Sequence, residues 1–93
     1  MKDAGNSFAS GGNDNTTIGD DSLKANTTGD GNAALGKDAL ALCTTGDNNT
    51  GLGHKAMSNG VVTGDDNTAL GRSAGYNVTS GDNNIFLGHD SGY

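Results

Sequence analysis

The sequence predicts an all-β fold, a parallel β-roll or solenoid of five repeats of about 17 residues, and three observations carry this prediction. First, the motif G-[D/N]-x-N-x-x-[L/I]-G-x-x-[A/S] recurs five times between residues 12 and 93. Second, its closing dipeptides are spaced by 17, 17, 18 and 17 residues: Ile18-Gly19, Leu35-Gly36, Leu52-Gly53, Leu70-Gly71 and Leu87-Gly88. Third, Gly, Asn, Asp and Thr dominate while Glu and Gln are absent, a composition that disfavours helix.

Each repeat has room for two short strands and two turns. The first strand is expected over N-x-x-[L/I]-G-x-x-[A/S], for example residues 67–74, and the second over the Thr-rich connector, for example residues 76–80. The G-[D/N]-x-N tetrapeptide is expected to form a turn in which glycine adopts positive φ. The extra residue of the longer spacing lies between Met57 and Val61, where a loosened turn is predicted.

Parallel stacking of such rungs, at about 4.8 Å each, would align equivalent residues in columns. We expect an apolar spine in the core of the roll: Ile18, Leu35, Leu52, Leu70 and Leu87. We expect a ladder of side-chain amides along the turns: Asn15, Asn32, Asn49, Asn67 and Asn84. Small residues beside most of the spine leucines would allow another sheet to approach closely.

The chain is poor in material for a core of its own. Leu, Ile, Val, Phe, Met, Tyr and Cys together make only 19 of its 93 residues, and a single cysteine, Cys43, excludes an internal disulfide. Identical chains are therefore expected to share the burial of apolar surface. A net charge of −6 argues against a nucleic-acid partner, and no 18-residue apolar run is present to insert into a membrane.

The motifs "GDNNTGLGHKA", "GDDNTALGRSA" and "GDNNIFLGHDS" resemble the head repeats of trimeric autotransporter adhesins. They resemble more closely the T-G-x-N-N-T-A-L-G-x-x-A-G repeats of bacteriophage tail fibres. The resemblance implies left-handed rolls that form a homotrimer, with their inner sheets facing the three-fold axis. It also implies a structural or adhesive fibre module for host attachment, located on a virion tail fibre or a bacterial cell surface. The partner would be a host glycan or protein.

Residues 12–93 are assigned to the five-repeat domain, and residues 1–11 to an N-terminal linker or cap. No neck motif and no heptad stalk are present, so the chain looks like a module of a longer fibre. Exposed variable positions are candidates for receptor contact: Lys55, Arg72 and Tyr76.

An alternative function is that of a solenoid that binds calcium or ice. Four stacked carboxylates are candidate calcium ligands: Asp30, Asp47, Asp65 and Asp82. Capping of the turns is the competing interpretation of these aspartates. The Thr-rich connector, which includes Thr27, Thr44, Thr63 and Thr79, could order water on a flat strand, although β-propensity alone also explains it.

Two histidines, His54 and His89, occupy equivalent places and could meet an ion only across a symmetry axis; a solvated role is the competing interpretation. No Ser-His-Asp arrangement, phosphate loop or paired glutamates are visible. The chain is therefore predicted not to be an enzyme and to need no cofactor.

Overall fold

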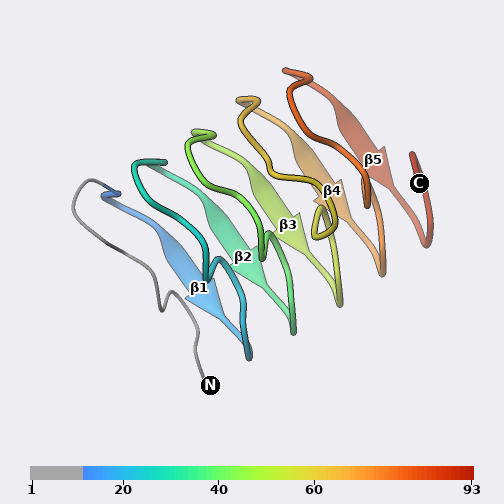
Figure 1. Ribbon diagram of the computed structural model, residues 1–93. Helices are drawn as coiled ribbons and strands as arrows, with labels where there is room; N and C mark the ends of the chain where they lie inside the picture. The colour runs from blue at the N-terminus through green and yellow to red at the C-terminus, as the bar shows by residue number, and fades with distance from the viewer. Residues whose placement is uncertain (1–11) are drawn as a thin grey trace.

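The computed structural model describes residues 12–93, so the predicted linker or cap at 1–11 lies outside the described residues. It confirms an all-β solenoid with one parallel five-stranded sheet in the order β1-β2-β3-β4-β5 (Figure 1). Each strand has three residues: β1 (Thr16–Ile18), β2 (Ala33–Leu35), β3 (Thr50–Leu52), β4 (Thr68–Leu70) and β5 (Ile85–Leu87).

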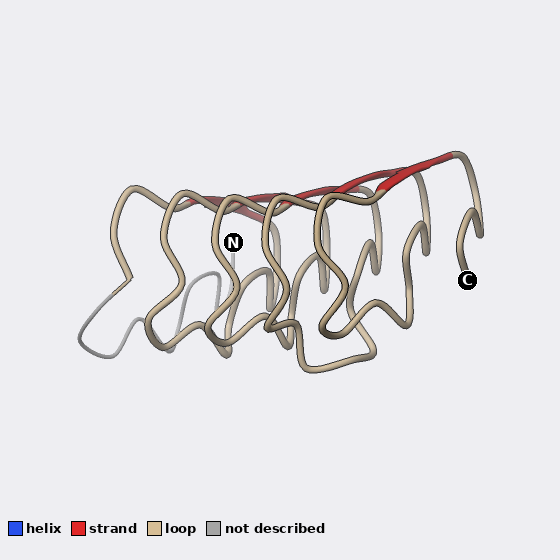
Figure 2. Ribbon diagram, turned by 90° about the horizontal axis from the view of Figure 1, so that it is seen from above, coloured by secondary structure: helices blue, strands red, loops and turns tan. Residues whose placement is uncertain are grey.

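The register of the sheet follows the sequence repeat. Ile18 pairs with Leu35, Leu35 with Leu52, Leu52 with Leu70 and Leu70 with Leu87, so the predicted columns exist. The extra residue between β3 and β4 does not disturb this register, because the 58–61 segment absorbs it. Viewed from above, the strands form one layer and the remaining chain of every rung loops back on one side of it (Figure 2).

The prediction of a second strand in each repeat is wrong. Among residues 12–93 the Thr-rich connector contributes only an isolated parallel bridge between Cys43 and Val62. The first strand also stops at the closing glycine, because the next residues turn sharply. The fourth residue after that glycine has positive φ in the first three rungs: 50° at Leu23, 50° at Leu40 and 48° at Met57.

Backbone hydrogen bonds hold these turns together from rung to rung. Leu23 N–H donates to the carbonyl of Ala39 at 2.9 Å, Leu40 N–H to Ala56 at 2.9 Å and Met57 N–H to Ala74 at 3.0 Å. The left-handed conformation is costly for leucine and methionine, since a bulky residue strains there. Complete burial of the three side chains offsets this cost.

The core lies between these turns and the middle residue of each strand. Leu23, Leu40 and Met57 are fully buried and fill the interior from the turn side. The opposing strand positions are correspondingly small: Ala34, Gly51 and Ala69 are all buried. Space is tight, since a Cβ on Gly51 would lie 3.0 Å from Cγ of Leu40.

The last rung reverses this division of volume. Its strand contributes Phe86, which packs against the core, while the turn positions of the fourth and fifth rungs hold Gly75 and Gly92. A Cβ on Gly75 would lie 2.9 Å from Cδ2 of Phe86 and 3.0 Å from Cγ of Met57. The large side chain therefore changes once from the turn to the strand, in the last rung, so that the core stays filled.

The predicted apolar spine is not in the core of the chain, which corrects that expectation. The five side chains point outward from the sheet with exposed fractions of 47% (Ile18), 47% (Leu35), 41% (Leu52), 49% (Leu70) and 63% (Leu87). Strand alternation defined two faces correctly, but the larger residues are on the outer one. The reason is that Leu23, Leu40 and Met57 already fill the narrow interior from the turn side. In the first four rungs the inward strand position is therefore Thr, Ala or Gly, and only the last rung has a large residue there.

Candidate functional site

The most prominent surface is the outer face of the sheet. We define the outer sheet face by the first and third residues of each strand: Thr16, Ile18, Ala33, Leu35, Thr50, Leu52, Thr68, Leu70, Ile85 and Leu87. Ile85 is 72% exposed, so this rung adds a second large apolar side chain to the leucine column. A contiguous apolar patch of this kind marks an interaction surface in soluble proteins.

A shallow apolar hollow interrupts the outer sheet face. Its volume is about 130 Å³ and it lies over β1, β2 and β3, with Ala34 and Gly51 among its lining residues. The hollow exists because the side chain of Ala33 is short compared with those of the threonines above and below it, Thr16 and Thr50. Such a hollow can accept a protruding aliphatic side chain from another protein surface.

The turns that precede the strands form an acidic side of the solenoid, here called the acidic edge. It carries six aspartates and, among residues 12–93, no lysine or arginine: Asp14, Asp30, Asp47, Asp65, Asp66 and Asp82. The edge after the strands, here called the mixed edge, carries four aspartates (Asp20, Asp21, Asp38, Asp90) and four cations (Lys24, Lys37, Lys55, Arg72). Since the mixed edge sums to zero, and Lys2 cancels Asp3, the acidic edge accounts for the whole net charge of −6.

The four candidate calcium ligands form a ladder with the backbone. Oδ1 of Asp30 accepts from the N–H of Asn13 at 2.7 Å, and Oδ1 of Asp47 from Asp30 at 2.8 Å. The same bond joins Asp47 to Asp65 and Asp65 to Asp82, each at 2.8 Å. These carboxylates thus cap turns, and no three His, Cys, Asp or Glu side chains in the described part of the chain gather closely enough to hold a metal ion.

The predicted asparagine ladder is confirmed. Oδ1 of each asparagine accepts the N–H of the next: Asn15 to Asn32 at 2.7 Å, Asn32 to Asn49 at 2.8 Å, then Asn49 to Asn67 and Asn67 to Asn84 at 2.9 Å. Each Nδ2 of the first four asparagines also donates to a glycine carbonyl of the next turn, at 2.6–2.8 Å. The ladder satisfies buried backbone groups where the chain turns into each strand.

The other predicted residues are scattered over the surface. His89 lies on the mixed edge, where Nε2 is 3.4 Å from Nη1 of Arg72 and 3.3 Å from Oδ2 of Asp90, and His54 is exposed on the same edge. The connector threonines lie on loops, and Thr27, Thr63 and Thr79 are exposed. The expectation of a flat threonine strand is therefore wrong.

Cys43 is buried in the core and is a free thiol. Burial raises the pKa of its thiol from the ordinary value of 9.0 to about 12. The Sγ–H donates to the carbonyl of Gly46 at 3.7 Å. The thiol is neutral at physiological pH and unsuited to act as a nucleophile.

A second hollow was not anticipated from the sequence. It lies beside the mixed edge and has a volume of about 240 Å³. Its lining comes from the first four rungs: Lys24, Asp38, Ala41, Leu42, Lys55, Ser58 and Tyr76. Two of the three suggested receptor-contact residues, Lys55 and Tyr76, belong to it, whereas Arg72 does not. We call it the Tyr76 hollow.

Comparison with known proteins gives no further guide. No family model, no curated protein and no solved structure matches the chain. Residues 12–93 contain no helix long and apolar enough to cross a membrane.

Proposed function

We propose that the chain is a structural and adhesive fibre module, a segment of a phage tail fibre or bacterial surface adhesin that assembles as a homotrimer. The observation that carries this proposal is the outer sheet face, whose leucine column is 41–63% exposed in a chain otherwise poor in large hydrophobic residues. Three such faces turned toward a common axis remove this apolar surface from water. The trimer number follows the resemblance to adhesin and tail-fibre repeats.

The geometry of the rung suits a rigid spacer. Every rung is bonded to its neighbours through the sheet, the asparagine ladder and the aspartate ladder, so repeating the unit adds length without flexible joints. Trimerisation through the outer sheet face leaves the turn side and the Tyr76 hollow facing outward. The module would thus present polar side chains to a glycan or protein on a host surface.

The solution mass tests the assembly. Native mass spectrometry and light scattering are expected to give a species of three times 9.2 kDa. Leu52→Lys should dissociate it, because this change places a charge at the centre of the outer sheet face, yet should leave the chain folded, since the side chain lies outside the core. The matched control is Val61→Lys: Val61 is 52% exposed but lies outside the sheet, so the assembly should persist.

A folded monomer of the unmodified chain would refute the assembly. Persistence of the trimer in Leu52→Lys would refute the outer sheet face as its contact surface.

A further inference from the structure

The Tyr76 hollow arises from one column of the solenoid. The fifth residue after the closing glycine is in turn Lys24, Ala41, Ser58, Tyr76 and Tyr93. Ala41 and Ser58 are short, while their neighbours Lys24 and Tyr76 are long, so the column has a gap two rungs wide. From Lys24 to Tyr76 is three rungs, or about 14 Å. The hollow therefore has room for a short chain of small rings.

The gap lies on the side of the rung away from the sheet. The preceding residue in each of the first three rungs, Leu23, Leu40 or Met57, points into the core toward the strands. The fifth residue instead lines the hollow in each of the first four rungs, and none of the residues that define the outer sheet face does so. Assembly through the outer sheet face would leave the hollow open.

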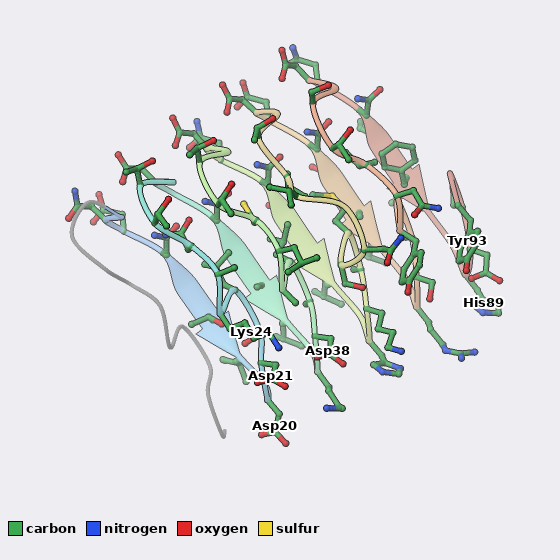
Figure 3. The ribbon with its side chains drawn as sticks, viewed as in Figure 1. Asp20, Asp21, Lys24, Asp38, His89 and Tyr93 are labelled. Atoms are coloured by element: carbon green, nitrogen blue, oxygen red, sulfur yellow. The ribbon has the colours of Figure 1, made fainter. Side chains whose placement is uncertain are left out.

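Tyr76 provides a flat wall at one end. Its ring stacks on that of Tyr93 in the next rung, with centroids 4.9 Å apart and an interplanar angle of 2°. Since Tyr93 covers one face from the C-terminal side, the other face of Tyr76 looks along the column toward Ser58 and the gap. An aromatic platform backed by a second ring is held in place before any ligand arrives. Figure 3 shows Tyr93 and Lys24 at opposite ends of this side of the molecule.

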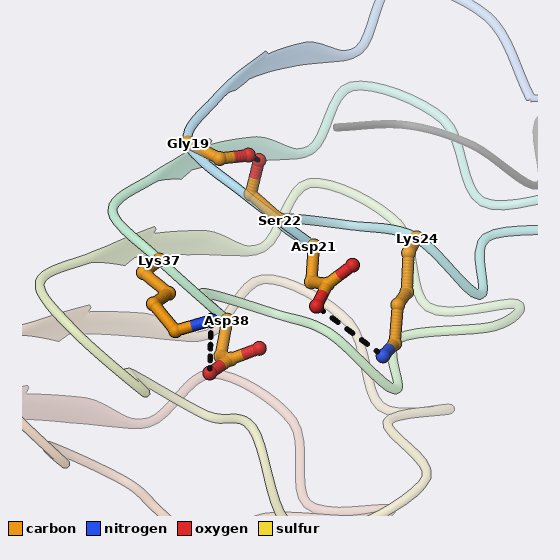
Figure 4. Close-up of polar contacts among 6 residues, drawn as sticks. All are labelled: Gly19, Asp21, Ser22, Lys24, Lys37 and Asp38. Carbon is orange, nitrogen blue, oxygen red and sulfur yellow. Dashed lines mark hydrogen bonds and ion pairs between the residues drawn. The ribbon is translucent and has the colours of Figure 1, made fainter. Parts of the chain in front are cut away.

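The charges around the hollow differ in how fully they are paired. Lys24 Nζ lies 3.8 Å from Oδ2 of Asp21, and Lys37 Nζ lies 3.7 Å from Oδ2 of Asp38 (Figure 4). The ammonium of Lys55, on the wall between them and Tyr76, has no ion-pair or hydrogen-bond partner within residues 12–93. The lining thus holds one unpaired cation, in a protein whose net charge is −6.

We propose that the Tyr76 hollow binds an acidic saccharide, a hexuronate or sialate unit. The apolar C–H face of the sugar ring would stack on Tyr76, its carboxylate would accept from Lys55, and its hydroxyls would exchange hydrogen bonds with Ser58 and Asp38. A concave site with an aromatic wall and a few convergent polar groups suits such a ligand. This inference rests on the proposed role in surface attachment and gives that role a ligand class.

Titration of the ¹⁵N-labelled chain tests the proposal, with 3′-sialyllactose and digalacturonate as probes and lactose as the neutral reference. The amide signals of Lys55, Ser58 and Tyr76 are expected to shift with the acidic sugars. Lys55→Gln should weaken this binding by about tenfold or more, because a charge-assisted hydrogen bond is lost. Ser58→Tyr should abolish it, since a third stacked ring would fill the gap outside the core. Arg72→Gln is the control, because Arg72 lies on the same edge but neither lines the hollow nor pairs with a residue that does.

Absence of shifts at these residues, or unchanged binding by Ser58→Tyr, would overturn the site. Equal affinity for lactose would overturn the assignment of an acidic ligand. Assembly is judged separately by mass in the same samples. The Leu52→Lys chain should still bind the sugars as a monomer, so failure of the trimer would leave this site standing. A trimer of the unmodified chain that binds no acidic sugar would refute the site alone.

Discussion

Replacement of Gly53 by alanine tests how the rungs are stacked. Gly53 closes the third rung with φ of +132°, and a Cβ there would lie 2.7 Å from both the carbonyl carbon and the oxygen of Gly71 in the next rung. Two independent penalties result. One is backbone strain, since a side chain rarely adopts this φ, and the other is a steric clash with backbone that cannot rotate away.

The structure allows both penalties to be estimated. Strain of this kind costs about 1–3 kcal/mol. Ordinary contact begins near 3.4 Å, so relief of the clash requires a shift of roughly 0.7 Å. The adjoining bond, from Gly71 N–H to the carbonyl of Leu52, is 2.9 Å long and would stretch beyond hydrogen-bonding range. Its loss adds about 1 kcal/mol, for a total of about 2–4 kcal/mol.

Gly88→Ala is the matched control. Gly88 has φ of +107°, but nothing lies within 4 Å of the position its Cβ would take. This variant therefore carries the strain without the clash. Urea unfolding followed by circular dichroism should show Gly53→Ala to be the less stable of the two by about 1 kcal/mol. Hydrogen exchange of the Gly71 amide should accelerate only in Gly53→Ala, which separates the clash from fraying of the last rung.

Equal unfolding free energies in the two variants, together with an unchanged Gly71 amide, would refute the reasoning. Strain alone would then explain the glycine column, and close contact between rungs would not.

Three further changes address the ladders and the core. Asn49→Ala should cost about 3 kcal/mol in urea unfolding, because it leaves the buried Asn67 N–H and a glycine carbonyl without partners. Asp47→Asn should be neutral or stabilising in low salt, since asparagine keeps the Oδ1 that accepts from the Asp30 N–H and removes one of six like charges. Clear destabilisation would contradict this. Cys43 should resist thiol reagents at pH 8 until the chain unfolds. The pKa of Cys43 is raised from 9.0 to about 12, so the unfolded thiol ionises at lower pH than the folded one. The free energy of unfolding should therefore be unaffected by this group below pH 9.0 and should fall between pH 9.0 and about pH 12. Urea unfolding against a Cys43→Ser chain checks this pH dependence.

The ladder columns were predictable because one residue type fills the whole asparagine column and four of the five positions of the aspartate column. An asparagine that recurs before a strand, as Asn32, Asn49 and Asn67 do, predicts the same hydrogen bond in every rung. The bonds from Asn49 N–H to Asn32 Oδ1 at 2.8 Å and from Asn67 N–H to Asn49 Oδ1 at 2.9 Å confirm this prediction. Which face of the strand points into the core was not predictable in the same way. Strict alternation separates Ala34 from Leu35 but does not indicate which of them points inward.

The turn side of the core escaped prediction because its residues contradict local preference. Leucine is a poor candidate for a left-handed turn, so nothing marked Leu23 or Leu40 as turn residues with φ of 50°. Their burial, which decides the facing of the sheet, follows from the winding of the rung. The Tyr76 hollow could have been found by comparing side-chain sizes down the column of Lys24, Ala41, Ser58 and Tyr76, once the period was known.

Variation within the chain separates the columns that hold the solenoid together from those that can carry specificity. The asparagine and closing-glycine columns are invariant in all five rungs, because each side chain or bare backbone must fit its own copy above and below. The residue after the closing glycine is Asp20, Lys37, His54, Arg72 and then His89, and all five are exposed. The column that forms the Tyr76 hollow varies as freely. In a stacked fold a site specific to one rung can arise only where neighbouring rungs differ. The proposed surface recognition would therefore use these variable columns, and the proposed assembly would use the sheet face, where the leucine column repeats.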